Sequence, residues 1–423
     1  MKVLFVSQYF VPVMGAPAVR TYDNCRRWVK DGHDVQVLTG HPNHPTGKLY
    51  PGYKMSMWQR EEIDGIDVLR MFTYLTPNKG KFRRIIQYVL FLFVSIIGSF
   101  GCAKPDIVIG TSPQFLVALA AWVISVFKRV PFVFEVRDLW PDSILAVGAL
   151  KNPLIIGFLR MIERLLYNKA AKIVVVTHAF KERLIEMGVD EAKIEVVTNS
   201  VDVKLFVPRE ACPQIRKEHN LEGKFVVSYI GTHGMAHDLD TVLNTAHELR
   251  HDDKMHFVFV GEGAEKQRLK KKRTQMRLNN VTFVDRQTRE QMPAWLATTD
   301  LHLVHLKANS LFKTVIPSKI FEIMGMGKPM VIAVDGEARR IVEKAESGKF
   351  SQPGNPKELA KTISEMAADP DKMKEMGERG RESALNVYNR DLLASKYIDI
   401  LTDVSGIQCN NAKKARKLSA GNA

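Results

Sequence analysis

The chain has 423 residues, 45% of them hydrophobic and 25% charged, a composition typical of a folded protein with two or three domains. This composition excludes a disordered chain, a collagen and a coiled coil. The formal net charge of +15 suits a protein that binds phosphates, an anionic membrane or a nucleic acid. Aromatic-basic strings and zinc-finger spacings are missing from the sequence, so we expect no nucleic-acid partner.

The four cysteines, Cys25, Cys102, Cys212 and Cys409, are far apart and include no Cys-x-x-Cys pair. This spacing predicts neither a disulfide framework nor a cysteine zinc site, and it favours a reducing compartment. Met1 leads directly into an apolar run rather than into a basic segment and a cleavable hydrophobic one, so we expect no signal peptide.

Short apolar runs alternate with helical patterns in the first half of the chain. The runs that we expect to be strands are Met1–Ser7, Asp34–Thr39, Asp106–Gly110, Pro131–Glu135 and Lys172–Thr177. Alternation of this kind predicts a parallel sheet with helices on both faces.

The same alternation of apolar runs and helical patterns begins again after the polar stretch Pro208–Gly223. The strands expected there are Lys224–Gly231, His256–Gly261, Val281–Val284, Asp300–His305 and Pro329–Val334. We therefore predict an α/β protein of two doubly wound domains, residues 1–207 and 208–390. A last helix at 391–404 is expected to cross back to the first domain, and 405–423 to form a disordered basic tail.

One segment of the first domain does not fit a soluble protein. Residues 85–103 carry no formal charge and follow the basic residues Lys79, Lys81, Arg83 and Arg84. A spanning helix needs about 20 apolar residues, so a true span is borderline, and a buried helix is the simpler alternative. An outer helix of a soluble domain normally has a polar face, however, and this segment has almost none. We therefore expect it to contact the inner leaflet of a membrane.

The loop after the first strand ends in the small residues Gly15 and Ala16, just before a helix. Small residues at this place let backbone N–H groups approach a phosphate, although an ordinary strand–helix turn has the same appearance. The loop is not a G-x-G-x-x-G motif, and no suitable acidic residue ends the second strand. A nicotinamide cofactor is therefore not expected.

Four charged residues, Glu135, Arg137, Asp138 and Asp142, follow the fourth strand. Ligands bind at the carboxyl ends of strands in open α/β sheets, so this density of charge favours a functional edge. The structural alternative is an ion pair between Glu135 and Arg137, with Asp142 capping a helix.

The most specific string runs from Pro317 to Pro329. Pro317 and Ser318 suit a helix start, and Lys319 and Glu322 lie one turn apart on the same face. The lysine can neutralise a diphosphate, and the carboxylate can accept hydrogen bonds from ribose hydroxyls. In isolation, such a pair would be interpreted as a surface ion pair.

These strings resemble those of the family 4 glycosyltransferases, in the same order and over about residues 1–400. The strings are residues 9–20, Glu135–Ser143, Val175–Val201, Phe259–Gly263 and Pro317–Pro329. The chain is most similar to the L-fucosamine transferase branch of bacterial O-antigen and capsule synthesis. The resemblance implies a GT-B fold, in which two Rossmann-like domains face a central cleft and the C-terminal one holds the nucleotide sugar. It also implies anomeric retention without a metal or another cofactor.

The resemblance assigns roles to single residues. Asp138, Lys319 and Glu322 would serve the reaction, with Asp138 at the place near the sugar where many relatives have a histidine. Glu322 matches the second of two glutamates eight positions apart, and the first falls on Thr314. The residues that would contact the donor are Gly15, Ala16, Arg20, Arg137, Gly231, His233, Gly261, Gly263, Arg286, Pro317 and Ser318.

Many relatives have an arginine and a lysine after the strand that ends at Gly231. This chain has Thr232, His233 and His237 in that stretch, so we expect Lys319 to neutralise the phosphates. Stabilising a nucleotide leaving group in this way is electrostatic catalysis, which needs no enzyme nucleophile.

The sequence thus predicts a retaining glycosyltransferase that moves an N-acetylhexosamine, such as N-acetyl-L-fucosamine, from a UDP-sugar to a polyprenyl diphosphate-linked glycan. The expected location is the cytoplasmic face of the inner membrane, where the protein would be peripheral or monotopic on anionic lipid. One alternative is a UDP-sugar epimerase of the same architecture, which would leave the apolar segment unexplained. The other is a non-catalytic membrane-associated scaffold, which the missing glutamate at Thr314 would suit.

Overall fold

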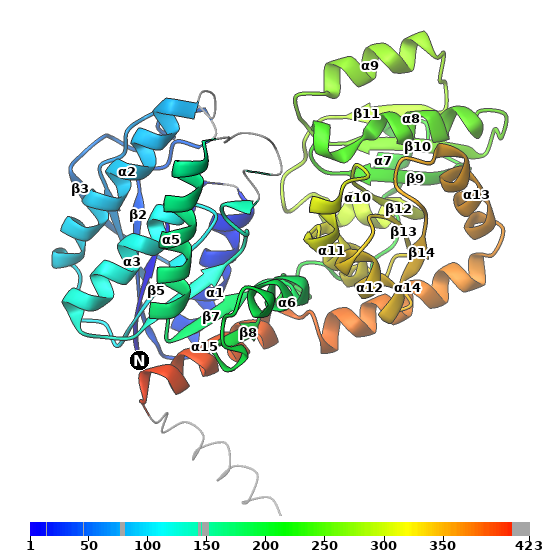
Figure 1. Ribbon diagram of the computed structural model, residues 1–423. Coiled ribbons are helices and arrows are strands. Elements are labelled where there is room, and N and C mark those ends of the chain that lie inside the picture. Colours follow the sequence, from blue (N-terminus) through cyan, green and yellow to red (C-terminus); the bar gives the residue numbers. More distant parts are fainter. Residues whose placement is uncertain (14, 45, 77–80, 143–144, 146–151, 408–423) are drawn as a thin grey trace, which may run out of the picture. The chain divides into compact units, whose positions relative to one another are not determined.

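The computed structural model describes residues 1–407 except 14, 45, 77–80, 143–144 and 146–151. The chain divides into two compact α/β units (Figure 1). The first contains Met1–Val197 and the segment from Leu393 onward, and the second contains Thr198–Leu392. The predicted basic tail lies outside the described residues from position 408 on.

The first unit is built on an eight-stranded sheet in the order β3-β4-β2-β1-β5-β6-β7-β8. All neighbours are parallel except β3 and β4, which form an antiparallel hairpin at one edge. The strands are β1 (Lys2–Val6), β2 (Asp34–Gly40), β3 (Trp58–Ile63), β4 (Ile66–Met71), β5 (Ile107–Thr111), β6 (Phe132–Val136), β7 (Lys172–Val175) and β8 (Ile194–Val196).

Helices cover both faces of this sheet, as alternating apolar residues in the strands require. On β1, Leu4 and Val6 pack under α2, α3 and α5, whereas Val3 and Phe5 pack under α1 and α15. Figure 1 shows α2, α3 and α5 on one face of the sheet. The helices are α1 (Ala16–Lys30), α2 (Lys81–Gly98), η1 (Ser99–Gly101), α3 (Phe115–Lys128), α5 (Pro153–Lys169), α6 (His178–Glu186), η2 (Glu191–Lys193) and α15 (Arg390–Ser405).

The second unit has a six-stranded, all-parallel sheet in the order β11-β10-β9-β12-β13-β14. The strand order reverses between β9 and β12, and the carboxyl ends of strands at such a switch point form the usual ligand site of an open sheet. The strands are β9 (Phe225–Ile230), β10 (Met255–Val260), β11 (Val281–Val284), β12 (Leu301–His305), β13 (Met330–Ala333) and β14 (Gly348–Phe350).

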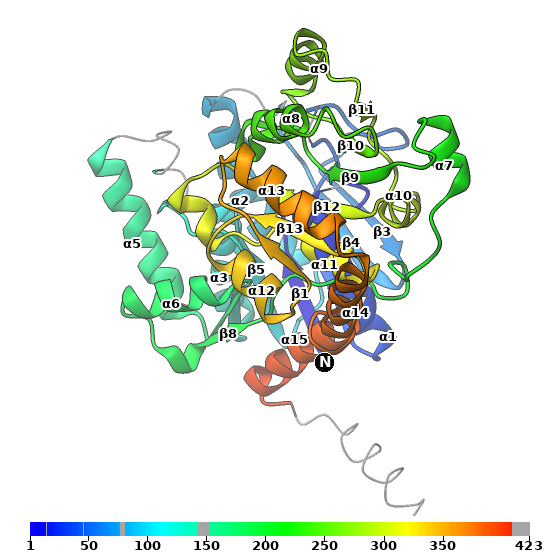
Figure 2. The same cartoon turned by 90° about the vertical axis from the view of Figure 1, so that its right-hand side faces the viewer.

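Two layers of helices sandwich this second sheet. On β9, Val226 and Ile230 pack with α11, α12 and α14, whereas Val227 and Tyr229 pack with α8, α9 and α13. Figure 2 shows α8 and α13 side by side. The helices are α7 (Pro213–Glu218), η3 (Met235–His237), α8 (Leu239–Glu248), α9 (Lys266–Gln275), α10 (Met292–Thr298), η4 (Ser310–Thr314), α11 (Lys319–Gly325), α12 (Glu337–Lys344), α13 (Pro356–Ala367) and α14 (Pro370–Asn386).

The division between the units lies ten residues before the expected position, at Val197 instead of 207. The reason is that Val201 and Phe206 are buried in the core of the second unit. The last helix, α15, belongs to the first unit from Leu393 on. There the Trp28 indole N–H donates to the Ala394 carbonyl oxygen at 2.9 Å, so the C-terminal helix packs against α1.

The apolar segment at 85–103 forms α2 and η1, and one side of α2 packs into the first unit through Gln87, Phe91, Val94 and Ser95. Its other side carries exposed apolar residues: Ile85, Ile86, Val89, Phe93 and Ile97. We call these five residues the outer face of α2. The stretch 83–101 is the one described helix that is long and apolar enough to cross a membrane, and a third of it is buried.

Candidate functional site

The loops that follow β9 and β12 meet at the switch point of the second unit. Gly231 directly follows β9, His305 ends β12, and the two strands are neighbours in the sheet. Helix α11 begins at Lys319, immediately after Pro317 and Ser318, as predicted from the sequence. This edge therefore combines residues from three separate parts of the chain.

The ammonium group of Lys319 lies in the middle of this edge. Its Nζ is 3.8 Å from the centre of the Tyr229 ring, and a Cβ added to Gly231 would stand 2.7 Å from it. Nζ is buried and has no hydrogen-bond partner among the described residues. Burial lowers the pKa of Lys319 to about 7, because the lost hydration of the charged form outweighs the attraction of the Glu322 carboxylate.

Three histidines share the same surroundings. The ring centres of His233 and His237 lie 6.1 and 5.9 Å from that of Tyr229. His305 Nδ1 lies 2.9 Å from the carbonyl oxygen of His237. A carbonyl can only accept a hydrogen bond, so this Nδ1 carries the proton and Nε2 of His305 keeps a free lone pair.

These imidazoles are buried and incompletely hydrogen-bonded. In the described part of the chain, both ring nitrogens of His233, Nδ1 of His237 and Nε2 of His305 have no partner. Burial is the largest cause that lowers the pKa of His233 and of His237, each to about 4. Buried polar atoms are normally paired, so this cluster of nitrogens, including Lys319 Nζ, has the character of a ligand site.

The glycines predicted to bind substrate bring the two loops together. Gly231 and Gly261 both have φ of +147°, and a Cβ on Gly261 would stand 1.9 Å from the carbonyl oxygen of Gly231. A Cβ on Gly263 would stand 2.2 Å from the carbonyl oxygen of His233. These positions therefore require glycine for the close approach of the loops after β9 and β10, and that approach fixes His233 beside Lys319.

Glu322 lies one turn after Lys319 and does not form the surface ion pair that an isolated Lys–Glu pair would form. Burial raises the pKa of Glu322, while Arg390 and Arg289 lower it, Arg390 having the larger effect. The guanidinium of Arg390 donates to the Ser200 carbonyl oxygen at 2.9 Å and is held in place by it. The carboxyl group of Glu322 is thus influenced by two guanidinium groups rather than ion-paired with Lys319.

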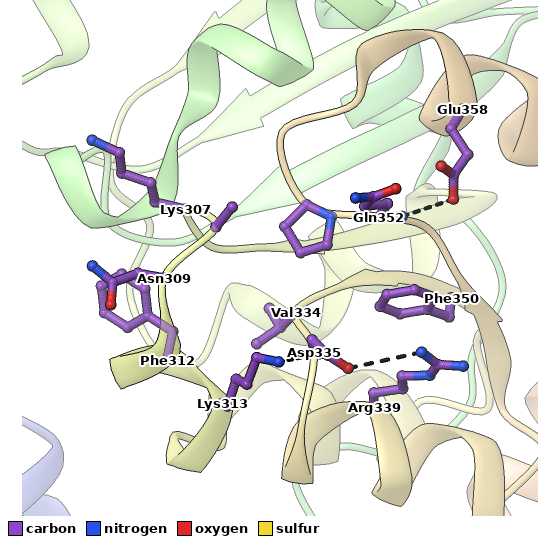
Figure 3. Close-up of a pocket in the computed structure, with 12 residues that line it drawn as sticks. Lys307, Asn309, Phe312, Lys313, Val334, Asp335, Arg339, Phe350, Gln352 and Glu358 are labelled. Atoms are coloured by element: carbon purple, nitrogen blue, oxygen red, sulfur yellow. Dashed lines mark hydrogen bonds and ion pairs between the residues drawn. The ribbon is translucent and has the colours of Figure 1, made fainter.

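A second feature of this unit is a cavity of about 540 Å³ beside η4 (Figure 3). Lys313, the neighbour of Thr314, is ion-paired there with Asp335 at 2.9 Å, and the Arg339 guanidinium lies 3.9 Å from the centre of the Phe350 ring. Two of its cations are thus already engaged by carboxylates or a ring. The cavity therefore suits a hydroxylated ligand better than a diphosphate, whereas Lys319 Nζ has no hydrogen-bond partner among the described residues that a diphosphate would have to displace.

In the first unit, Arg20 and Arg137 surround the buried carboxylate of Glu135. Arg20 Nε lies 3.0 Å from Glu135 Oε1, and Arg137 donates to the Pro17 carbonyl oxygen at 3.1 Å. The two guanidinium charges, Arg20 first, outweigh burial and lower the pKa of Glu135, so it stays ionised. Both arginines thus have structural partners, as in the ion-pair alternative.

The remaining predicted residues lie at three further places. Gly15 caps the N-terminus of α1 with extended φ and ψ, and a Cβ there would meet nothing closer than 3.8 Å. The backbone N–H of Asp138 donates to the Ser112 hydroxyl oxygen at 3.1 Å, just after β6. Arg286 is exposed after β11, two strands away from the switch point. Ala16 starts α1, and its side chain is outside the described part.

Sequence reasoning missed two members of the cluster around Lys319. Tyr229 is inside a buried strand, where an aromatic residue is normally interpreted as part of the hydrophobic core, and His305 ends another strand. Only the pairing of β9 with β12, which are not consecutive, places them together. Among the described residues, no three His, Cys, Asp or Glu side chains converge as metal ligands would.

Two family models match the chain, and each falls within or close to the bounds of one unit. A glycosyl transferase 4-like domain matches residues 15–200, and a glycosyl transferases group 1 domain matches residues 212–383. Together the two matches take up most of the sequence.

Curated relatives carry names of the same class. A protein of Escherichia coli named as a colanic acid biosynthesis glycosyl transferase, WcaI, is 25% identical over 79% of this chain and 84% of its own length. A protein of Pseudomonas aeruginosa named as a probable glycosyltransferase, WbjE, is 25% identical over 70% of this chain and 75% of its own length.

Solved structures share the fold over nearly the whole chain. HepE of Anabaena, solved in complex with UDP, has a TM-score of 0.69 at 17% identity and covers 95% of this chain and 100% of its own. WaaG, a glycosyltransferase involved in lipopolysaccharide biosynthesis, has a TM-score of 0.66 at 15% identity. The match covers 95% of this chain and 99% of WaaG. These neighbours confirm the predicted GT-B fold of two Rossmann-like domains.

Proposed function

The chain belongs to the family 4 glycosyltransferases, and from that premise we propose that it moves a sugar from a UDP-sugar to a lipid-linked glycan. The donor of such an enzyme is a nucleotide sugar. UDP is favoured by HepE, which was solved with UDP and with UDP-glucose. Bacterial surface polysaccharide synthesis is favoured by the names of WcaI and WaaG.

One observation carries the proposal: within the described part of the chain, the buried ammonium group of Lys319 at the switch point has no hydrogen-bond partner. A donor diphosphate bound there would accept hydrogen bonds from Lys319 and from the imidazole N–H groups of His233 and His237. Glu322, one helical turn away, would accept hydrogen bonds from the ribose hydroxyls. The cavity beside Thr314 would take part of the saccharide.

The chemistry we propose is electrostatic. As the bond between the sugar and the diphosphate breaks, negative charge grows on the leaving phosphate, and Lys319 stabilises it in surroundings that exclude water. Asp138, at the carboxyl edge of the first unit's sheet, would act at the sugar. We propose retention of the anomeric configuration and no required metal, on the resemblance to the family. An N-acetylhexosamine, and N-acetyl-L-fucosamine in particular, is the donor sugar that the same resemblance favours.

The test is a transfer assay with a panel of UDP-sugars and a polyprenyl diphosphate-linked glycan, scored by product mass. Lys319→Ala should weaken UDP binding about 10- to 100-fold, since a hydrogen bond to a charged group contributes about 1.5–3 kcal/mol. The control is Lys328→Ala, because burial also lowers the pKa of Lys328 in the same unit. Lys328 lies at the opposite end of the sheet, just before β13, so its removal should leave UDP binding unchanged.

The assay also separates the alternative functions. Interconversion of the UDP-sugar without an acceptor would replace this proposal with an epimerase. Nucleotide-independent binding of a partner without turnover would indicate a scaffold. Equal UDP binding by the wild type and by Lys319→Ala would show that the donor site has been placed wrongly.

A further inference from the structure

The site around Lys319 has an unusual composition for a cluster that is to hold a diphosphate. Its facing groups are one amine and three imidazoles, from Lys319, His233, His237 and His305, and none of them is a permanently charged guanidinium. Each of these groups can exist as a neutral base. Because the nitrogens are buried, the empty site favours the neutral forms.

The groups surrounding the cluster supply too little negative charge to offset the effect of burial. On α9, Lys266 is ion-paired with Glu262 and Asp285, both at 2.5 Å, and its charge together with that of Lys270 opposes protonation of His233. Glu262 acts in the favourable direction, but less than Lys266.

The other elements around the cluster add two carboxylates and a neutral phenol. On α11, Glu322 acts on Lys319, but burial raises the pKa of Glu322 itself. Asp238, at the start of α8, acts on His305. On β9, burial raises the pKa of Tyr229, so its ring offers Lys319 only the face of a neutral phenol.

We propose that the nucleoside diphosphate binds together with protons, which add to Lys319 first and then to the imidazoles of His233 and His237. This inference rests on the proposed donor site. Each proton comes from the solvent, adds to a nitrogen lone pair as the diphosphate enters, and returns to the solvent when UDP leaves. A bound diphosphate brings negative charge within hydrogen-bond distance of these nitrogens, and that stabilises their cationic forms. At pH 8 the site is thus nearly uncharged when empty and cationic when occupied.

This coupling has a measurable size. With a pKa of about 7, Lys319 carries a proton in roughly a tenth of the empty molecules at pH 8. Binding that requires the ammonium form must then take up close to one proton per UDP. By linkage, the Kd for UDP should rise nearly tenfold between pH 7.5 and 8.5. The terminal phosphate of UDP has a pKa near 6 and does not titrate in this range.

The experiment is calorimetry of UDP binding to the full chain at pH 8, in a HEPES and in a Tris buffer. Protons drawn from the two buffers carry different ionisation enthalpies, so the difference in observed enthalpy counts the protons taken up. We expect close to one proton per UDP for the wild type. Lys319→Arg should bind UDP with almost no uptake at pH 8, because arginine is always protonated.

Proton uptake by the histidines is measured in the Lys319→Arg background at pH 7, where His237→Gln should remove the part that His237 contributes and leave that of His233. The matched control is His256→Gln. Burial also lowers the pKa of His256 to about 4, but this residue lies near the amino end of β10, where its Nε2 is 2.9 Å from the Thr282 hydroxyl oxygen. In the Lys319→Arg background this control should take up as many protons as Lys319→Arg alone.

The experiment distinguishes a failure of proton coupling from a failure of the proposed function. UDP that binds with the same enthalpy in both buffers and the same Kd at pH 7.5 and 8.5 would overturn proton coupling and leave the donor site intact. No binding of UDP at millimolar concentration would overturn the proposed function and this inference with it.

Discussion

A carboxylate one helical turn from a lysine can form an ion pair with it or can accept hydrogen bonds from a ligand. The position of Glu322 favours the second role. Glu322 forms no ion pair with Lys319, and the guanidinium of Arg390 that acts on it is already bound to the Ser200 carbonyl oxygen. The acidic group therefore contributes little to holding α11 in place. Its replacement should affect binding more than folding.

Glu322→Gln keeps the size of the side chain and removes its charge. We expect the KM for the donor to rise about tenfold, since a hydrogen bond to a charged group is worth about 1.5–3 kcal/mol, while the melting temperature stays within a degree or two. Steady-state kinetics and thermal unfolding check this together. A lowered melting temperature with an unchanged KM would make Glu322 a structural residue.

Asp138 and Glu135 are three residues apart but differ in their surroundings. Glu135 is buried and paired with Arg20, so removal of its charge would disturb the core. Asp138 lies beyond the end of β6 and is partly exposed, at the sheet edge where ligands bind.

For Asp138→Asn we therefore expect turnover to fall at least a hundredfold while UDP affinity and melting temperature change little. Single-turnover rates and UDP titrations measure the two effects separately. Unchanged turnover in a less stable protein would show that Asp138 serves the fold.

The sequence could predict part of this site at the level of single residues. Lys319 and Glu322 are one turn apart in a helix that begins where Pro317 and Ser318 place it, so local spacing was sufficient. Tyr229 and His305 could not be assigned, because they meet only through the pairing of two strands that are distant in the sequence.

At the level of elements, the loops after β9 and β10 form one packed structure. Gly261 contacts the backbone of Gly231 so closely that any side chain would displace one of the two loops. Gly234, in the same region, would place a Cβ 3.6 Å from the side chain of Thr232, which is an ordinary contact.

This difference gives a matched pair of variants. Gly261→Ala should destabilise the second unit by about 3 kcal/mol and abolish UDP binding, because the clash and the φ of +147° both oppose a side chain. Gly234→Ala should be tolerated in both respects. Thermal unfolding and UDP titration check the pair, and similar behaviour of the two variants would contradict the packing argument.

The strands that were expected lie close to the observed ones, but β4, β8 and β14 were not expected, although β4 (Ile66–Met71) is itself largely apolar and buried. The hairpin of β3 and β4 was missed because Trp58–Ile63 is an edge strand with exposed and charged residues and so lacks such a run. Its turn is nonetheless visible in the sequence: Asp64 and Gly65 have φ of +49° and +78°, and Asp-Gly is a strong hairpin signal.

At the scale of the whole molecule, the domain division could be predicted only approximately. Composition changes after Pro208, but the division is set by Val201 and Phe206, which are buried in the second unit although they precede that change. Burial of this kind depends on the final packing, which local sequence does not reveal.

The net charge of +15 and the apolar outer face of α2 together favour a membrane surface. Arg83 and Arg84 are exposed at the start of α2, and each exposed cation contributes about 1 kcal/mol near an anionic leaflet. The apolar surface continues beyond α2, since the Phe100 and Phe127 rings lie 6.2 Å apart and both are exposed. We propose that this surface holds the protein, as a peripheral or monotopic protein, on the cytoplasmic face of the inner membrane.

This proposal predicts that the wild type floats with anionic liposomes at low salt. Changing Ile85, Phe93 and Ile97 to serine should release it, because these side chains are more than half exposed, at 56, 57 and 66%, and their loss removes apolar area without opening the core. UDP binding should remain within twofold of wild type, since Lys319 and the cluster around it lie in the other unit. The control is Leu385→Ser with Leu392→Ser, two exposed apolar residues of the second unit whose loss should leave flotation unchanged. A wild type that stays in the soluble fraction would show that the outer face of α2 does not bind lipid.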